Sequence, residues 1–360
     1  VMSAPETDGP VLVTGAAGFI GSWVVEALRA RWPTRPIVSF DALTYAGDRT
    51  HLAALDGDVN HTFVLGNVND RSAVRAALER HRPTALLHLA AESHVDRSIL
   101  DPLAFVRTNI EGTAILLQEA VHLWGDRRDV RFVHVSTDEV YGPTPDGVRF
   151  DESSPYRPSS PYAASKASSD HLVRSWHHVY GLPTIVTHCT NNYGPRQFPE
   201  KLLPVVVSRA LQHQPVPIYG RGTNVRDWLY VADHALGLIA ALERGRPGRT
   251  YCFSAENERS NLWLVEQLMT LLDARLGRAP GQSRTLVKFV ADRPAHDLRY
   301  ALDATRARDE LGWSPRMPYA QGLEHTVSWY VEHQTWTERM RARQAAFEAT
   351  WYEGRGGEQP

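Results

Sequence analysis

The sequence predicts an α/β protein built on a doubly wound parallel sheet, with a smaller α/β region beside it. Short apolar, β-branched runs alternate with helical patterns over the first half of the chain, and from about Asn191 onward this alternation decays into Pro- and Gly-punctuated segments. Such alternation is typical of parallel strands whose connecting helices cover both faces of the sheet. With 360 residues, the chain has room for one large unit and a smaller one.

Six strands and four helices carry this prediction. The strands are expected at Val11–Thr14, Ile37–Phe40, Thr62–Leu65, Ala85–Leu89, Arg131–Ser136 and Thr184–Cys189. The helices are expected at Phe19–Trp32, Arg71–Arg80, Pro102–Trp124 and Pro161–Tyr180. The last two helices follow an Asp-Pro and a Ser-Pro pair, in which the polar residue suits the N-cap and the proline suits the first turn.

Composition excludes several classes of function. Lys and Arg total 39 and Asp and Glu total 41, so the net charge of −2 gives no general attraction for nucleic acid. No run of 18 uncharged apolar residues predicts a membrane span, and the first ten residues lack a signal-peptide pattern. The two cysteines, Cys189 and Cys252, have no CxxC spacing, which favours a reducing, cytoplasmic setting. The scattered histidines predict no metal site.

Three glycines lie between the first strand and the first helix. Gly15, Gly18 and Gly21 follow a GxxGxxG spacing, and a glycine triplet alone could be a tight turn. The strand before it and the helix after it favour another interpretation, because backbone N–H groups and the helix dipole there can hold a pyrophosphate. The loop therefore predicts dinucleotide binding by a Rossmann-type domain over residues 10–190. Residues 191–335 would then bind mainly the substrate, interleaved with the first domain.

Asp41 bears on which dinucleotide is bound. It ends the second strand twenty residues beyond Gly21, where a carboxylate can accept hydrogen bonds from the adenine ribose hydroxyls and repel a 2′-phosphate. The position favours NAD over NADP. Two alternatives stay open: a solvated Asp at a strand end, and a phosphate accommodated by Arg49. The last stretch, residues 336–360, is charged and Arg-rich and predicts a solvated helical extension with a frayed Gly-rich end.

A tyrosine and a lysine supply candidate redox chemistry. Tyr162 and Lys166 lie at i and i+4 in the first turns of a predicted helix, so they share one face. A free phenol is a poor base at neutral pH, but an adjacent cation and a helix N-terminus both favour the phenolate. Tyr162 could then accept a hydroxyl proton while a nicotinamide accepts hydride. A YxxxK pattern also arises by chance in helices, so the glycine loop upstream is what makes it informative.

Two adjacent carboxyls narrow the chemistry. Thr137, Asp138 and Glu139 follow the strand Arg131–Ser136, at the end of the strand where doubly wound sheets place ligands. Oxidation at one carbon needs only the Tyr and Lys pair, whereas elimination of water also needs a base for a carbon acid and an acid for the departing hydroxyl. Without its context, such a pair would be a solvated strand end.

Together these motifs resemble the dTDP-glucose 4,6-dehydratases of the extended short-chain dehydrogenase/reductase superfamily, over about Val11 to Tyr330. The matching segments are VTGAAGFIGS at 13–22, DALTYAG at 41–47, LAAESHVDRS at 89–98, STDEVYG at 136–142, SPYAASKASSDHL at 160–172, NNYGPRQFPEKLLP at 191–204, RDWLYV at 226–231 and DRPAHDLRY at 292–300. The resemblance implies oxidation of the sugar at C4, loss of water across C5 and C6, and return of the hydride to C6. Tyr162 would take the 4-hydroxyl proton, Glu139 the C5 proton, and Asp138 would protonate the leaving hydroxyl. Because this cycle is redox-neutral, NAD could stay bound between turnovers.

The resemblance also implies two sets of binding residues. The NAD set is Gly15, Gly18, Phe19, Ile20, Gly21, Asp41, Leu43, Thr44, Gly47, Asn67, Val68, Leu89, Ala90, Ala91, Ser93, Thr108, Tyr162, Lys166 and Asn192. The nucleotide-sugar set is Ser93, Thr137, Asp138, Glu139, Asn191, Lys201, Leu202, Pro217, Tyr219, Arg226, Asn261, Arg293 and His296. Arg226 and Arg293 would suit a diphosphate, because a guanidinium is a permanent, forked donor, although either could be a surface charge.

Departures from the family pattern and competing functions remain open at this point. Asn67 stands where the family usually has Asp, Ala295 where it has Gly, and Ser254 and Ala255 where it has a Gly pair. A nucleotide-sugar 4-epimerase or decarboxylase would share the glycine loop, the tyrosine and the lysine, but would not need the carboxyl pair. A non-catalytic NAD-binding regulator is a third possibility on the same fold. By resemblance, Pro102–Trp124 and Pro161–Tyr180 would form the seam of a homodimer, and the pathway and final deoxysugar are not indicated.

Overall fold

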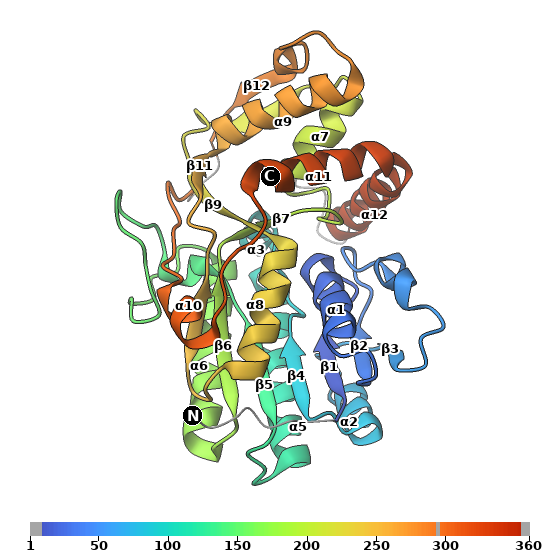
Figure 1. Cartoon of the computed structure of the whole chain (residues 1–360), viewed down its shortest axis with the longest axis vertical. Helices are drawn as coiled ribbons and strands as arrows, with labels where there is room; N and C mark the ends of the chain where they lie inside the picture. Colours follow the sequence, from blue (N-terminus) through green and yellow to red (C-terminus); the bar gives the residue numbers. More distant parts are fainter. Residues whose placement is uncertain (1–8, 293–295, 354–360) are drawn as a thin grey trace.

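A seven-stranded parallel sheet forms the larger layer of the molecule in a computed structural model that describes residues 9–292 and 296–353 (Figure 1). Its strands are β1 (Val11–Thr14), β2 (Ile37–Asp41), β3 (His61–Leu65), β4 (Ala85–His88), β5 (Arg131–Val135), β6 (Thr184–Cys189) and β10 (Thr250–Phe253). They lie in the order β10-β6-β5-β4-β1-β2-β3. The six predicted strands are confirmed. Strand β10 was not predicted, because a four-residue run carries little periodicity.

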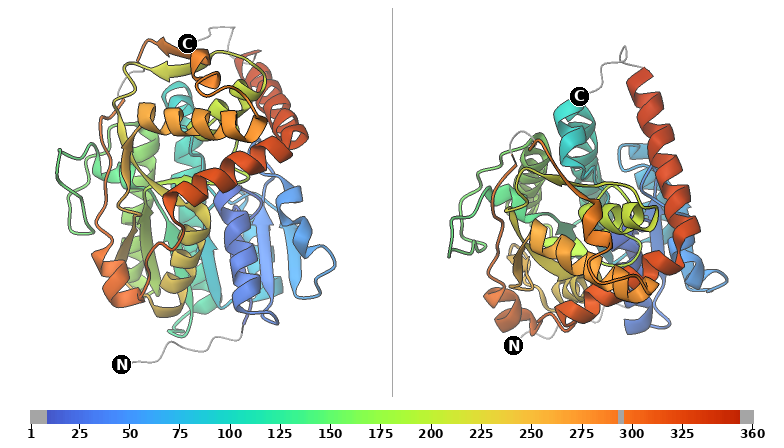
Figure 2. Two further views of the ribbon diagram at one scale, coloured as in Figure 1. Left: turned by 45° about the horizontal axis from the view of Figure 1, so that its top comes forward. Right: turned by 90° about the horizontal axis from the view of Figure 1, so that it is seen from above.

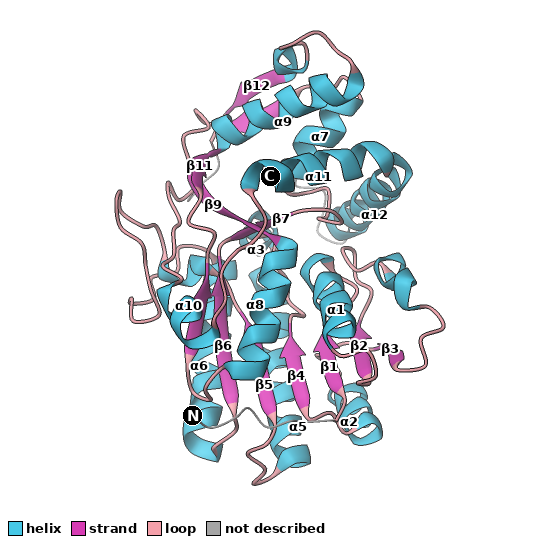
Figure 3. Cartoon of the chain, in the orientation of Figure 1, coloured by secondary structure: helices cyan, strands magenta, loops and turns pink. Residues whose placement is uncertain are grey.

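Strand register brings the ends of the strands to one edge of the sheet. Thr14, the last residue of β1, pairs with Phe40 on one side and with His88 on the other. The chain moves outward from β1 to β3 in one direction and from β4 to β6 in the other. The change of direction between β1 and β4 is the switch point at which doubly wound sheets bind ligands. Figure 3 shows the strand arrows ending at this common edge.

Helices cover both faces of the sheet. One face is covered by α1 (Phe19–Arg31), α8 (Val231–Arg244) and α10 (Thr305–Leu311), and the other by α2 (Arg71–His81), α5 (Gly112–Trp124) and α6 (Pro161–Tyr180). Each face has its own apolar core, with Val25 and Leu28 of α1 in one and Leu116 and Leu117 of α5 in the other. The predicted two-sided sheet is confirmed, and burial of both strand faces explains the continuous apolar strands.

The predicted helix Pro102–Trp124 is helical throughout, but part of it is π-helical and not α-helical. It consists of α4 (Pro102–Phe105), a π-helical turn η2 (Val106–Glu111) and α5. Its cap is as predicted, since the Asp101 carboxylate accepts from the Ala104 N–H, and the Ser160 hydroxyl caps α6 in the same way. A π turn inserts one extra residue into the helix, and such insertions gather at functional sites.

A smaller layer covers the carboxyl edge of the large sheet (Figures 1 and 2). Its strands are β7 (Asn191–Tyr193), β9 (Val225–Tyr230) and β11 (Glu258–Ser260) in one sheet, and β8 (Val216–Tyr219) and β12 (Val287–Val290) in another. Its helices are α7 (Leu202–Leu211), α9 (Asn261–Leu276) and α11 (Tyr319–Glu332). A separate apolar core holds these elements together, built around Tyr193, Val206, Leu268 and Tyr330.

The last described helix is α12 (Gln334–Glu353), and the expectation of a solvated extension is wrong for its first part. The expected Gly-rich end falls outside the described residues. Met340 is fully buried and Thr337 is 5 % exposed, so one face of α12 packs against the body. The remaining short elements are η1 (Arg49–Leu55), α3 (Val95–Leu100), η3 (Asp138–Tyr141) and η4 (Ser283–Leu286). Within the described ranges, no helix has the length and apolar character needed to cross a membrane.

Candidate active site

A cavity of about 360 Å³ lies at the switch point, between the large sheet and the smaller layer. All the predicted NAD residues except Leu43 line it. From the predicted sugar set it is lined by Ser93, Thr137, Asp138, Glu139, Asn191 and Lys201. The fold therefore brings together residues from eight separate segments of the chain.

The glycine loop forms one end of this cavity and fits a pyrophosphate. Gly15 has a φ of +68°, and a Cβ on it would come within 2.7 Å of the Ala90 nitrogen. A Cβ on Gly21 would lie 2.0 Å from the Gly15 carbonyl oxygen, which no side chain tolerates. Helix α1 begins at Phe19 after Gly18, which provides no side-chain cap, and residues 18–21 of this helix start line the cavity. Such a helix start is an anion-binding site.

Asp41 is not a solvated strand end. It is 8 % exposed, and its carboxylate accepts from the N–H groups of Ala17 at 2.8 Å and Leu43 at 2.7 Å. Burial raises its pKa, although these two hydrogen bonds oppose the shift. Arg49 instead lies over the Phe63 ring at 4.5 Å and is not among the residues lining the cavity. The geometry supports a carboxylate beside a ribose and gives no support to a phosphate held by Arg49.

The two carboxyls lie just beyond β5, where the sequence placed them. Asp138 is 5 % exposed, and burial together with the neighbouring charge of Glu139 raises its pKa to about 8. Thr137 caps the turn η3, accepting from the Glu139 N–H at 3.3 Å and donating to Asp138 Oδ1 at 3.2 Å. Asp138 is therefore mostly protonated at neutral pH, as a general acid needs to be.

Tyr162 and Lys166 both line the cavity from α6, but their electrostatics differ from the expectation. The pKa of Tyr162 is raised well above its usual value, because burial disfavours the phenolate and the charge of Glu139 acts in the same direction. The Lys166 ammonium donates to the Val135 carbonyl at 2.8 Å, and burial lowers its pKa to about 8. Burial therefore outweighs the stabilisation of the phenolate that was expected from Lys166 and the helix start. The cost of desolvating the phenolate exceeds both effects.

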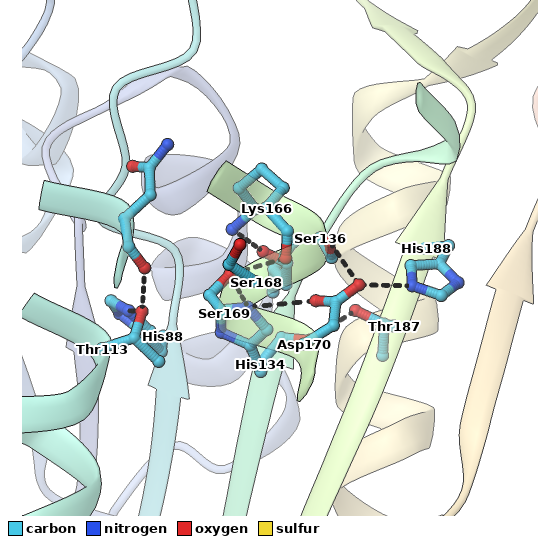
Figure 4. Close-up of polar contacts among 12 residues, drawn as sticks. His88, Thr113, His134, Ser136, Lys166, Ser168, Ser169, Asp170, Thr187 and His188 are labelled. Atoms are coloured by element: carbon cyan, nitrogen blue, oxygen red, sulfur yellow. Dashed lines mark hydrogen bonds and ion pairs between the residues drawn. The ribbon is translucent and has the colours of Figure 1, made fainter. Parts of the chain in front are cut away.

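A buried polar network lies between helix α6, which carries Tyr162 and Lys166, and the adjacent strands of the large sheet (Figure 4). The Asp170 carboxylate, one turn beyond Lys166, lies between the Nε2 atoms of His134 at 3.3 Å and His188 at 3.0 Å. Ser136 and Tyr156 donate to the same carboxylate at 3.1 and 2.8 Å. Asp170 has no exposed surface, and the hydrogen bonds from both histidines hold its pKa well below the usual range despite burial. The negative charge of Asp170 in turn opposes the lowering of the Lys166 pKa by burial.

The π turn contributes a residue that the sequence analysis missed. Asn109 accepts from the Glu92 N–H at 2.9 Å and donates to the Ser165 hydroxyl at 2.8 Å. It thereby ties the segment after β4 to the catalytic helix, while Thr108 beside it lines the cavity. No propensity signal marks a π turn, and nothing in the sequence sets the Thr108-Asn109 pair apart from the other polar residues of this helix.

Several predicted sugar-binding residues lie in the smaller layer but not on the cavity wall. These are Leu202, Pro217, Tyr219, Arg226, Asn261 and His296. Arg226 is 7 % exposed and donates to the carbonyls of Val225 and Asp297, so its guanidinium is held by backbone. The rings of His296 and Tyr219 lie 6.4 Å apart on the outer part of that layer. Arg293 and the departure Ala295 fall outside the described residues.

One departure from the family pattern has a structural account. The Ser254 hydroxyl donates to the Asp227 carboxylate at 2.7 Å, and the Ala255 N–H donates to the same oxygen at 3.0 Å. Asp227 has no exposed surface, so these donors compensate a buried charge next to Arg226. Asn67 still lines the cavity, with its own side chain accepting from the Asn69 N–H at 2.9 Å.

Further polar groups on the cavity wall were not singled out from the sequence. They include Glu92, Ser136, Cys189, Thr190, Gln197 and Glu200. Most lie inside the motifs already quoted, so their position beside chosen residues was the available signal. Across residues 9–292 and 296–353, no group of three His, Cys, Asp or Glu side chains is arranged to hold a metal ion.

Comparison with known proteins agrees with this site. A family model described as GDP-mannose 4,6 dehydratase matches residues 12–326. The chain is 49 % identical over 334 residues to a dTDP-glucose 4,6-dehydratase of Xanthomonas campestris, covering 91 % of this chain and 94 % of that one. It is 46 % identical to dTDP-glucose 4,6-dehydratase 1 of Escherichia coli K12, covering 96 % and 99 %. A dTDP-glucose 4,6-dehydratase of Streptomyces venezuelae, solved with NAD bound, superposes with a TM-score of 0.84 at 44 % identity, covering 92 % and 99 %. The chain therefore belongs to the dTDP-glucose 4,6-dehydratase family of the extended short-chain dehydrogenase/reductases.

Proposed function

We propose that this protein is an NAD-dependent dTDP-glucose 4,6-dehydratase that forms dTDP-4-keto-6-deoxyglucose. The observation that carries the proposal is that Asp138 lies buried beside Glu139 in the same cavity as Tyr162, where burial raises its pKa to about 8. One carboxyl poised as an acid next to a second carboxyl is what elimination of water requires. The names of the relatives support the nucleotide sugar as substrate.

The cofactor fits the larger layer. The uncapped start of α1 would take the pyrophosphate, and Asp41 at the end of β2 would face the adenine ribose. Solved relatives carry NAD, which supports the same cofactor here. When bound, NAD accepts and returns a hydride, and its positive ring favours a phenolate nearby. We propose that residues 10–190 bind it chiefly and that residues 191–335 bind chiefly the sugar nucleotide.

The side chains then divide the proton transfers. Tyr162 removes the 4-hydroxyl proton as C4 is oxidised, and the Lys166 ammonium on the same helix would offset part of the phenolate charge. Glu139 removes the C5 proton, which the new 4-ketone has made acidic. Asp138 delivers its proton to the C6 hydroxyl, which leaves as water, and Thr137 orients Asp138 through its hydroxyl. Each transfer by a positioned acid or base contributes roughly 10²–10⁴-fold.

The nucleotide-sugar residues are proposed by family resemblance in two groups. Ser93, Asn191 and Lys201 on the cavity wall would contact the sugar, and Lys201 already donates to the Ser93 carbonyl at 3.1 Å. The outer group would hold the nucleotide and diphosphate along the smaller layer. That group is Leu202, Pro217, Tyr219, Arg226, Asn261, Arg293 and His296.

A nucleotide-sugar 4-epimerase or decarboxylase is the main alternative, and a non-catalytic NAD-binding regulator is the third. An epimerase would use Tyr162 and Lys166 in the same cavity, but it has no use for a carboxyl whose pKa is raised to about 8. A regulator would need neither. The carboxyl pair therefore favours the dehydratase.

The test separates oxidation from elimination. The double variant Asp138→Asn, Glu139→Gln keeps the shape of both side chains but removes their proton exchange. Mixed with dTDP-glucose in a single turnover, the variant should accumulate reduced nicotinamide, followed by its ultraviolet absorbance. It should not form the 4-keto-6-deoxy product. Formation of that product at the wild-type rate would overturn the proposal and return the epimerase to consideration.

Tight retention of NAD is a companion proposal. Because the cycle returns the hydride to the product, the cofactor need not leave between turnovers. Denaturing the purified protein should release about one nicotinamide per chain. A supernatant free of nicotinamide would contradict tight retention, though not the reaction itself.

A homodimer is supported by exposed apolar side chains. Leu103 is 59 % exposed on α4, and Val179 and Tyr180 are 67 % and 47 % exposed at the end of α6. All three residues lie in the two helical regions, Pro102–Trp124 and Pro161–Tyr180, that form the dimer seam by resemblance. Sedimentation should give twice the chain mass of 40.3 kDa, and Leu103→Glu should shift it toward the monomer. A monomer for the unmodified protein at micromolar concentration would refute the dimer.

A cytoplasmic setting is also proposed. Both cysteines, Cys189 and Cys252, are buried and unpaired, which suits a reducing environment.

A further inference from the structure

Helix α12 lies beside the loop that follows β2, residues 41–48 (Figures 1 and 2), and its side chains bond to this loop. The Arg343 guanidinium donates to the carbonyls of Gly47 at 2.8 Å, Thr44 at 2.8 Å and, more weakly, Leu43 at 3.5 Å. One turn earlier, Arg339 pairs with the Asp48 carboxylate at 2.5 Å. These arginines are four residues apart, so both point from one face of the helix.

A third side chain of the same face completes the contact. The Trp336 indole N–H donates to Asp48 Oδ2 at 3.1 Å, and its ring lies 5.5 Å from the ring of His51. Arg339 also donates to the Thr50 hydroxyl at 3.0 Å. The three positions 336, 339 and 343 repeat the spacing of one helical stripe. This stripe makes α12 a packed part of the molecule.

The opposite side of the loop is tied to the glycine loop. The Asp48 N–H donates to the Ala17 carbonyl at 3.0 Å, and His51 Nδ1 lies 2.9 Å from the same oxygen. Ala17 in turn donates to Asp41 at 2.8 Å. The loop is thus held between the phosphate-binding end of the cavity and α12.

The loop has little structure of its own. Leu43 adopts a φ of +49°, which a branched side chain rarely takes. Within residues 42–47 of the described chain, the bond from the Gly47 N–H to the Thr44 carbonyl is the one backbone hydrogen bond. Its residues Asp41, Ala42, Thr44, Ala46 and Gly47 nevertheless form a wall of the cavity. Without Arg343, the Gly47 and Leu43 carbonyls would need water as a donor, whereas the Thr44 carbonyl also accepts from the Gly47 N–H. A loop of this kind depends on outside contacts to stay in one conformation.

We propose that Arg339 and Arg343 of α12 are positioning residues that hold the loop over residues 41–48 closed and so set how slowly NAD leaves. The two arginines line none of the cavity themselves, so they act through the loop. This inference rests on NAD binding as proposed above, and not on the sugar or the elimination. It gives the C-terminal extension a role in retaining the cofactor of a redox-neutral cycle.

The experiment measures NAD release without any sugar. Holoenzyme is mixed with excess fluorescent etheno-NAD, and exchange of the bound nucleotide is followed by fluorescence. Arg343→Ala should release NAD about tenfold faster, since it removes charge-assisted hydrogen bonds to three carbonyls. Arg343→Lys, which keeps the charge but not the fork, should lie in between. Hydrogen exchange of the amides in residues 42–50 should rise in the same order.

Arg341→Ala is the matched control. It removes the same charge from the same helix, but Arg341 contacts Gln212 at 2.6 Å and not the loop. It should leave both NAD release and loop exchange unchanged. Equal release rates for Arg343→Ala and Arg341→Ala, in proteins of equal thermal stability, would overturn the inference. If Arg343→Ala does not fold, Arg343→Lys decides: release at the wild-type rate refutes the role of the fork.

Discussion

The Thr137 hydroxyl donates to Asp138 Oδ1 at 3.2 Å, while the buried Asp138 Oδ2 has no hydrogen-bond partner among the described residues. A carboxylate in this position would leave one charged oxygen uncompensated, so the protonated form is favoured. The free oxygen belongs to a residue of the cavity wall. Under the proposed mechanism, this geometry suits Asp138 to give a proton to a ligand in the cavity.

The first prediction is a pH dependence of elimination. The pKa of Asp138 is raised to about 8, so the acid form is present below that pH and is lost as pH rises through it. The rate of water loss in a single turnover should therefore fall above about pH 8. Asp138→Asn should be slower by roughly 10²–10⁴-fold and should lack this limb. A variant with an unchanged profile would show that another group supplies the proton.

The same residue predicts a change in stability. Its ordinary pKa is 3.8 and its folded pKa about 8, so between these values the folded state keeps a proton that the unfolded chain has released. The contribution of Asp138 to stability therefore declines as pH rises across this window. The asparagine of Asp138→Asn cannot ionise. The variant should therefore raise the melting temperature relative to wild type more at about pH 9 than at about pH 4, the two ends of this window. Equal differences at both pH values in calorimetry would contradict the raised pKa.

A third prediction concerns the phenol. Tyr162→Phe removes the proton acceptor but keeps the ring, which packs edge-on at 6.2 Å from Phe105. Turnover should fall by roughly 10²–10⁴-fold, because hydride transfer then lacks its base. Etheno-NAD exchange should stay at the wild-type rate, which serves as the control for an intact site. Turnover near the wild-type level would remove Tyr162 from the mechanism.

The fourth prediction concerns the network behind α6. Asp170→Asn removes the negative charge that raises the pKa of Lys166, so Lys166 should lose its proton at lower pH. The measurement uses the Asp138→Asn, Glu139→Gln background, in which only oxidation of C4 takes place. The pH dependence of that oxidation rate that follows the Lys166 proton should move to lower pH. The free energy of unfolding should also drop by about 1–3 kcal/mol, because buried donors lose a charged partner.

Ser168→Ala is the control for this fourth prediction. Ser168 lies on the same helix, is half-buried, and donates only to the Ala164 carbonyl among the contacts of the described chain, at 2.8 Å. It should change neither the pH profile nor the stability appreciably. A drop in stability for Asp170→Asn without any shift of this pH dependence would show that Asp170 supports the fold but does not tune Lys166.

Much of the fold and site could be predicted because the relevant signals are local. The strands β1 to β6 and helix α6 are encoded by apolar runs and by caps such as Ser160, which depend on neighbours a few residues away. The glycine spacing, Asp41, the Tyr162 and Lys166 pair and the Asp138 and Glu139 pair are read within single motifs. Their meeting in one cavity follows from the rule that parallel strands end at a common edge.

What only the tertiary structure decided depends on distant contacts. The raised pKa values of Asp138 and Tyr162 come from burial by other segments, which no motif reveals, and the Lys166 effect expected from helix spacing was outweighed by it. The π turn around Asn109, the strand β10 and the charge of Asp170 between two histidines likewise depend on packing between remote elements. The grip of Arg343 on Thr44 joins residues 299 positions apart. Sequence alone showed an arginine-rich tail, because a helix period states which residues share a face but not what that face will meet.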